Sequence, residues 1–246
     1  MLKINVCIAT YNRNDHLYKT LASLAAMDPA GLEAVELTAC IIDNNPDMRA
    51  EAVYARAKAD FPGLKLAYWQ EREAGVVHVR NTALNQSADA DFVAFIDDDQ
   101  LATPRWLKGL LDCHQQTGSA VCHGPILAQY PANTPKWLSD GDFQSVHYEG
   151  THQSDRPGSV GNSLIHMAAL KASGLQFDPA TSLTGGEDTL LFTLMHKNGA
   201  ILAECEAGAV LETVPDDRAS YAWQMKRWRR EGGTDAMVKY HGKPDL

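Results

Sequence analysis

Residues 92–100 read FVAFIDDDQ, in which five apolar residues are followed at once by three aspartates. A continuous apolar run of this length is typical of a strand that is buried on both faces of a parallel sheet. Asp97, Asp98 and Asp99 then crowd the end of that strand, where neighbouring carboxylates repel each other by about 1 kcal/mol per pair in water and by more where water is scarce. The stretch therefore predicts a buried sheet and, at its end, a cation that offsets the repulsion.

Strand-like and helix-like patterns alternate around this stretch. Strands are expected at 3–10, 35–43, 64–70 and 91–97, and helices at 15–27, 48–60 and 76–87. Further regular patterns occupy 161–174, 185–200 and 219–233, with a pair of strands around 201–205 and 208–213, whereas 130–159 is irregular. This alternation predicts an α/β fold whose central sheet is Rossmann-like and mostly parallel, with helices on both faces. The length of 246 residues favours one domain, 1–246.

The bulk composition narrows the class of protein. Hydrophobic residues make up 45% of the chain and charged residues 22%, as in soluble globular proteins. The formal net charge of −9 argues against a nucleic-acid partner, because such proteins present a basic surface to the phosphates. Five cysteines without CxxC spacing indicate reduced thiols, and no stretch reaches the roughly 18 apolar residues of a membrane span. We expect a cytoplasmic protein, with peripheral contact between the basic C-terminal helix and an anionic membrane as an alternative.

Polar clusters follow three of the expected strands, at 10–13, 43–45 and 97–99. Because ligands of an open parallel sheet bind beyond the carboxyl ends of its strands, these clusters are expected to converge on one edge. Carboxylate oxygens without neighbouring Cys or His suit Mg²⁺ or Mn²⁺. Asp97 and Asp99 are therefore candidate metal ligands. The alternative is a solvated acidic turn that caps the following helix.

Glu187 and Asp188 follow a pair of glycines and precede a helical pattern. One interpretation is a general base on a rigid helix, with the two flexible glycines allowing a substrate to approach it. The other is that carboxylates in a first helical turn complement the helix dipole. The spacing alone leaves both interpretations open.

Basic and aromatic residues gather near the C-terminus, where Arg227 and Arg230 lie at i, i+3 on one expected helical face beside Trp228. They form either a diphosphate clamp next to an aromatic platform for a sugar or base, or the basic end of an amphipathic helix. Arg80 in the expected helix 76–87 is likewise either a phosphate ligand or a solvated helical residue.

Six short motifs, taken in order, resemble family 2 glycosyltransferases of the GT-A fold. They are TYNR (10–13), IIDNN (41–45), GVVHVRN (75–81), FIDDD (95–99), GGEDT (185–189) and QMKRW (224–228), and the resemblance spans roughly residues 3–233. The later motifs look most like the bacterial exopolysaccharide subgroup that includes succinoglycan glucosyltransferases. A nucleotide-binding half, 1–125, and an acceptor-binding half with the catalytic base, 126–246, are expected on this basis.

The resemblance implies a role for each matching residue. The residues expected to bind a nucleotide-sugar donor are Thr10, Tyr11, Arg13, Asp43, Arg80, Asn81, Asp97, Asp98, Arg227 and Arg230, with Asp43 facing the base. Asp99, with Asp97, would coordinate Mn²⁺ or Mg²⁺ on the diphosphate. Asp188 would be the catalytic base and Glu187 would orient the acceptor, which Gly186 and Trp228 would contact.

The implied reaction is inverting transfer from a nucleotide diphosphate sugar, a UDP-sugar, to a hydroxyl of a saccharide or lipid-linked saccharide. Val79 departs from the family's usual Ala before Arg-Asn, and Asn45 from its commoner Ser. The QxxRW residues also occur in processive members, but those carry membrane helices that this sequence lacks, so single addition is expected. The competing hypotheses are a sugar-nucleotide nucleotidyltransferase and an inactive sugar-nucleotide or glycan-binding module.

Overall fold

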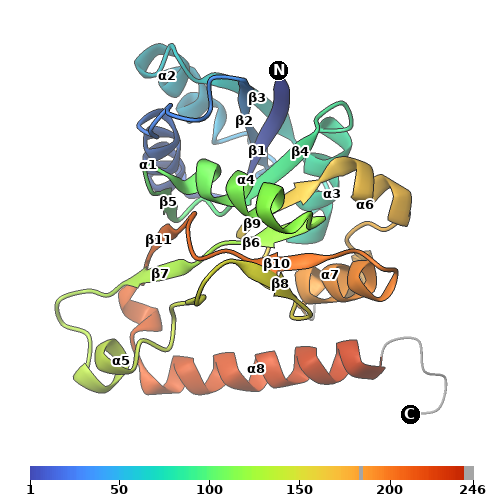
Figure 1. Ribbon diagram of the computed structural model, residues 1–246. Coiled ribbons are helices and arrows are strands. Elements are labelled where there is room, and N and C mark those ends of the chain that lie inside the picture. Colours follow the sequence, from blue (N-terminus) through green and yellow to red (C-terminus); the bar gives the residue numbers. More distant parts are fainter. Residues whose placement is uncertain (183–184, 241–246) are drawn as a thin grey trace.

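The computed structural model describes residues 1–182 and 185–240, and its centre is a large twisted sheet (Figure 1). In spatial order the strands are β3 (Lys65–Gln70), β2 (Val35–Asp43), β1 (Leu2–Thr10), β4 (Phe92–Ile96), β9 (Asn162–His166), β6 (Val121–His123), β10 (Leu202–Glu204) and β8 (His152–Ser154). β9 runs antiparallel to β4 and β6, and β8 runs antiparallel to β10, whereas the other neighbours are parallel. The predicted mostly parallel sheet is therefore confirmed.

Helices cover both faces of this sheet because alternate residues of its strands point to opposite sides. Ile4, Val6 and Ile8 of β1 are fully buried in one core, against α1 (Asn14–Ala25), α2 (Glu51–Asp60) and α4 (Trp106–Thr117). Cys7 and the β4 residue Val93 face the other core, with α3 (Val76–Gln86), α6 (Met167–Ser173) and α7 (Glu187–Lys197). Burial on both faces explains why the sequences of β1 and β4 read as almost continuous apolar runs.

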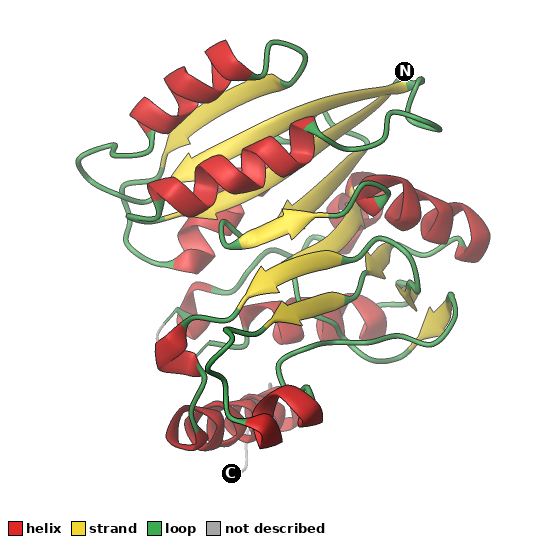
Figure 2. Ribbon diagram, turned by 90° about the vertical axis from the view of Figure 1, so that its left-hand side faces the viewer, coloured by secondary structure: helices red, strands yellow, loops and turns green. Residues whose placement is uncertain are grey.

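A second, three-stranded sheet lies beside the end of β4 (Figure 2). Its order is β5 (Gln100–Ala102), β11 (Val210–Thr213) and β7 (Ile126–Gln129). The expected pairing of the strands around 201–205 and 208–213 is wrong, because β10 joins the large sheet and β11 joins this small one. The antiparallel register of β5 and β11 sets Glu212 opposite Gln100, directly after the three aspartates.

The remaining elements are short or peripheral. Within 130–159 only α5 (Lys136–Gly141) and β8 are regular, and the 3₁₀ turns η1 (Pro179–Thr181) and η2 (Asp216–Arg218) connect larger elements. α8 (Tyr221–Tyr240) packs on α7 and forms the lower edge of the molecule in Figure 1, with α5 beside its N-terminal end. No helix in the described part of the chain is long and apolar enough to cross a membrane.

Candidate active site

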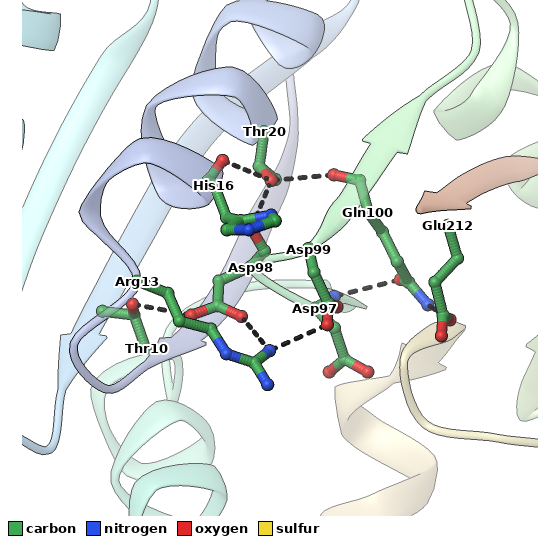
Figure 3. Close-up of polar contacts among 9 residues, drawn as sticks. All are labelled: Thr10, Arg13, His16, Thr20, Asp97, Asp98, Asp99, Gln100 and Glu212. Carbon is green, nitrogen blue, oxygen red and sulfur yellow. Dashed lines mark hydrogen bonds and ion pairs between the residues drawn. The ribbon is translucent and has the colours of Figure 1, made fainter. Parts of the chain in front are cut away.

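The three aspartates occupy the turn between β4 and β5, where α1 fixes their positions. Asp98 is almost fully buried, and its carboxylate accepts hydrogen bonds from the Thr10 hydroxyl at 2.8 Å and from Arg13 Nη1 at 3.0 Å. The same Nη1 lies 2.8 Å from Asp99 Oδ2, so one guanidinium joins two of the three carboxylates (Figure 3). The Thr20 hydroxyl, about two turns into α1, donates to the Asp98 carbonyl oxygen at 2.9 Å and anchors the turn backbone.

Asp97 differs from its two neighbours because its carboxylate has no hydrogen-bond donor among the described residues, although the Asp97 backbone N–H donates to Gln100 Oε1 at 3.1 Å (Figure 3). Burial is the main cause that raises the pKa of Asp97 to about 7; the charges of Asp99 and Glu212 contribute to this rise and Arg80 opposes it. A partly buried carboxylate with acidic neighbours and no donor is a group that an added cation would stabilise.

Glu212 and Arg218 complete the surroundings of Asp97. Gln100 Nε2 donates to Glu212 Oε2 at 3.0 Å, and burial raises the pKa of Glu212. Arg218 of η2 reaches the same space from the loop after β11. Neither residue was expected from the sequence, because only the pairing of β11 with β5 brings this segment to the acidic turn.

These groups line a first cavity of about 400 Å³ beyond the ends of β1 and β4. Its lining residues are Ala9, Thr10, Tyr11, Arg13, Asn44, Val76, Val79, Arg80, Asp97, Asp98, Asp99, Glu212 and Arg218. The cavity therefore collects a half-exposed aromatic ring, Tyr11, together with three arginines and four carboxylates. Such a mixture suits a ligand that combines a flat apolar group with an anionic one.

Two residues expected in this cavity are instead engaged elsewhere. The Asp43 carboxylate is buried and accepts from the backbone N–H groups of Asn45 at 2.8 Å and Ala50 at 2.9 Å, and from the Tyr68 hydroxyl at 2.9 Å. Asn81 exchanges two hydrogen bonds with the backbone of Phe177, at 2.9 and 3.0 Å. Asp43 shapes the loop after β2 and Asn81 attaches η1 and its flanks to α3.

A second cavity, of about 510 Å³, lies between the start of α7 and the inner face of α8. Its lining residues are Val76, Pro157, Gly158, Ser159, Gly185, Gly186, Glu187, Asp188, Thr189, Arg227, Arg230, Glu231, Thr234 and Asp235. Arg227 and Arg230 do share one helical face, as expected, but that face opens onto this cavity and not onto the acidic turn.

The Asp188 carboxylate is held by backbone groups at the entrance to α7. The Thr189 N–H donates to Oδ1 at 2.8 Å and the Val160 N–H to Oδ2 at 3.3 Å. Gly186, with φ of +83°, forms the N-cap of this helix in the left-handed region, where a side chain is strained. A Cβ at Gly186 would also collide with the methyl group of Thr234 on α8.

An ion pair between Arg80 and Glu187 lies where the two cavities meet. Arg80 lines the first cavity, Glu187 lines the second, and Val76 borders both. Their side chains are only 10% and 9% exposed, so the pair is buried. The two cavities thus meet at a buried contact between α3 and α7, with Asp97 on one side and Asp188 on the other.

Comparisons with known proteins identify the family of this chain. Residues 5–176 match the family model described as Glycosyl transferase family 2, which is more than half of the chain. The chain belongs to glycosyl transferase family 2. The transferase is 34% identical over 244 residues to the succinoglycan biosynthesis protein ExoM of Rhizobium meliloti, covering 98% of this chain and 77% of the relative. It is 23% identical over 172 residues to the glucosyl-dolichyl phosphate glucuronosyltransferase of Haloferax volcanii, covering 66% and 52%.

Solved structures share the fold of the transferase. S. aureus TarS 1–349 in complex with UDP-GlcNAc superposes with a TM-score of 0.65 at 18% identity, covering 96% of this chain and 70% of that one. The mannosyltransferase PcManGT of Pyrobaculum calidifontis, in complex with GDP-Man and Mn²⁺, superposes with a TM-score of 0.68 at 18% identity, covering 98% and 65%. These matches confirm the predicted GT-A fold. Because the chain belongs to a glycosyltransferase family, the alternative hypothesis of a nucleotidyltransferase is rejected.

The acidic turn of the transferase fits a divalent cation that shares its coordination with a ligand. In the described residues no three His, Cys, Asp or Glu side chains converge into a complete set of metal ligands. Asp97 nevertheless presents to the first cavity a partly buried carboxylate without a donor among the described residues, and Asp99 and Glu212 add negative charge beside it. Mg²⁺ and similar cations are commonly held by one or two carboxylates together with substrate phosphates, and this donor set matches that pattern.

A fully buried histidine lies close to Asp188. Burial lowers the pKa of His123 to about 4, and the charge of Asp188 opposes that shift. Its ring meets the Phe192 ring edge-on, with centroids 4.8 Å apart, and Gly158 leaves the space that it fills.

Trp228 is 42% exposed, contacts the Phe143 ring and lines neither cavity.

Proposed function

We propose that this transferase moves a sugar from a UDP-sugar in the first cavity to a saccharide hydroxyl in the second, with inversion at the anomeric carbon. The single observation that carries the proposal is the pair of cavities that meet at the Arg80–Glu187 ion pair, one lined by the acidic turn and the other by Asp188. Inversion requires the attacking hydroxyl and the leaving diphosphate to lie on opposite sides of the sugar. Two adjoining cavities support such an arrangement, with the donor in one and the acceptor in the other.

In the first cavity the chain would bind the nucleotide and offset the charge of its diphosphate. Tyr11 offers an exposed ring against which a base could stack, and Arg218 offers a guanidinium for phosphate oxygens. Asp97 and Asp99 would hold a divalent cation, which would stabilise the negative charge that develops on the leaving diphosphate. Arg13 would keep Asp98 and Asp99 in place through its two ion pairs.

In the second cavity Asp188 would remove the proton from the acceptor hydroxyl as that oxygen attacks the sugar. The backbone donors of Val160 and Thr189 orient its carboxylate, which leaves the remaining lone pairs to face the cavity. Glu187, which is paired with Arg80, would orient the acceptor where the two cavities meet. The general base would contribute about 10²- to 10⁴-fold in rate.

Two relatives support the class of product and acceptor. The R. meliloti relative is named a succinoglycan biosynthesis protein, which supports a role in surface polysaccharide synthesis. The H. volcanii relative is named for a glucosyl-dolichyl phosphate, which supports a lipid-linked saccharide as acceptor. The transferase would then work at the cytoplasmic side of a membrane.

The test begins with a thermal-shift screen of UDP- and GDP-sugars with Mn²⁺, because a ligand at 100 times its Kd stabilises the folded state by about 2.7 kcal/mol. UDP release is then measured with the donor that binds. Asp188→Asn should lower kcat by about 10²- to 10⁴-fold and leave the Kd for UDP unchanged. Asp155→Asn, at an exposed position outside both cavities, is the matched control. Near-normal turnover of Asp188→Asn would disprove the assignment of the base.

A further inference from the structure

An exposed patch of large apolar side chains joins α5 to the N-terminal half of α8. The aromatic patch consists of Trp137, Phe143, Tyr221, Met225 and Trp228, which are 41–64% exposed. Ring contacts connect its members, with centroid distances of 6.0 Å for Trp137–Tyr221 and 5.6 Å for Phe143–Trp228. Half of the ten exposed large apolar side chains in the described residues lie here, so they form a contiguous patch and are not isolated surface residues.

The charged residues of α8 divide into those that line the second cavity and those that do not. Glu231, Asp235, Arg227 and Arg230 line the second cavity. The other three charged residues of the helix, Lys226, Arg229 and Lys239, are exposed outside that cavity, and all three are positive. Tyr221, Met225 and Trp228 follow the i, i+4, i+7 spacing of one helical face. Outside the second cavity, the exposed charged residues of α8 are therefore all positive, although the chain has a net charge of −9.

We propose that the aromatic patch and the outward cations of α8 bind the surface of an anionic lipid bilayer. Trp and Tyr favour the membrane–water interface, where an apolar ring and a polar edge are both accommodated. Lysine and arginine beside them are attracted to anionic headgroups, and each contributes about a fivefold increase in affinity near the surface, or about 1 kcal/mol. The chain would lie on the membrane without crossing it, since no helix in the described residues is able to span one.

The position of the patch favours a bilayer over other occupants. α8 and α5 form one edge of the molecule, away from α1 and α2 (Figure 1). The opposite face of the same helix lines the second cavity, so a bilayer on the outward face would lie one helix diameter from that cavity. An uncharged glycan would use the rings but not the three cations. The proposal concerns binding to lipid alone and stands whether or not the donor and base assignments above are correct.

Flotation with vesicles tests the proposal. The purified chain should float with vesicles of phosphatidylcholine and phosphatidylglycerol at 3:1 and not with phosphatidylcholine alone, and added salt should weaken the binding. Lys226→Gln with Arg229→Gln should weaken it about 30-fold, or 2 kcal/mol at 1.4 kcal/mol per tenfold. Trp137→Ser with Tyr221→Ser should weaken it at least tenfold, and the blue shift of tryptophan fluorescence on adding vesicles should shrink.

The matched control is Lys19→Gln with Lys58→Gln, which removes two exposed cations from α1 and α2 and should leave vesicle binding unchanged. Circular dichroism checks that every variant is folded. Failure to float with the anionic vesicles, or equal losses in the α8 and control variants, would overturn the proposal. So would a concentration-dependent dimer, measured by light scattering without lipid, that the α8 variants abolish, because the patch would then be an interface between copies of the chain.

Discussion

Removal of Arg80 should destabilise the chain far more than removal of an exposed cation. Arg80 and Glu187 are 10% and 9% exposed, and Arg80 also favours the charged form of Asp97. Arg80→Met would leave Glu187 buried without its counter-charge, and breaking a buried pair in this way costs about 3–5 kcal/mol. For a chain of this length, each 1 kcal/mol lowers Tm by about 2–4 °C, so the loss of about 4 kcal/mol corresponds to roughly 8–16 °C.

A double variant distinguishes the effect of losing the ion pair from the effect of losing packing contacts. Arg80→Met with Glu187→Leu replaces both charges by apolar side chains and should regain most of the lost free energy of unfolding, because no isolated charge remains. Urea unfolding followed by far-UV circular dichroism measures all the variants. Lys65→Met, which breaks an exposed pair with Glu36 whose side chains are 62% and 39% exposed, should cost less than about 1 kcal/mol. The reasoning fails if Arg80→Met costs no more than this control, or if the two single losses simply add.

Three further perturbations test other parts of the site. Gly186→Ala should lower the free energy of unfolding by about 2–4 kcal/mol, and Gly185→Ala by only about 1–2 kcal/mol. Both glycines have positive φ, but only Gly186 faces the Thr234 methyl group. Equal losses in urea unfolding would contradict this explanation. Because the folded pKa of His123, about 4, lies below its unfolded value of 6.5, its contribution to stability is lost as pH falls from 6.5 towards 4. Between pH 7 and pH 5 the loss of free energy of unfolding due to His123 amounts to about 2 kcal/mol. Urea unfolding at the two pH values should therefore show a difference that is about 2 kcal/mol smaller in His123→Gln than in the unmodified chain. An unchanged difference would exclude His123 as the cause. Arg218→Gln should weaken UDP binding by about tenfold or more in calorimetry, and unaltered affinity would place the diphosphate elsewhere.

The strands of the first half and the convergence of their ends could be predicted from the sequence. Burial on both faces leaves an unmistakable apolar run in β1 and β4, and polar loops follow those runs at once. Thr10, Arg13 and Asp98 meet as expected. Asp43 does not join them, because an aspartate at a strand end can bond the backbone two residues further on, and that local bond closes its own loop.

The second half of the site depended on contacts that no local pattern reveals. Glu212 reaches Asp97 only through the β5–β11 register, across more than a hundred residues. The i, i+3 spacing of Arg227 and Arg230 correctly indicated a shared face, but the direction of that face follows from the packing of α8 on α7. The separate sheets of β10 and β11 have the same origin, since strand patterns predict strands and not their partners.

The small β5–β11–β7 sheet has a consequence for the order in which the protein is made. Among the described residues β11 is the last strand in sequence order, so it leaves the ribosome after the other described strands, and it supplies Glu212 to the first cavity. Contacts between segments so distant in sequence form late, because the chain between them must first be ordered. A nascent chain that already contains the three aspartates would therefore lack the complete cavity until β11 has paired. Affinity for the proposed nucleotide would thus arise only after β11 has joined the small sheet.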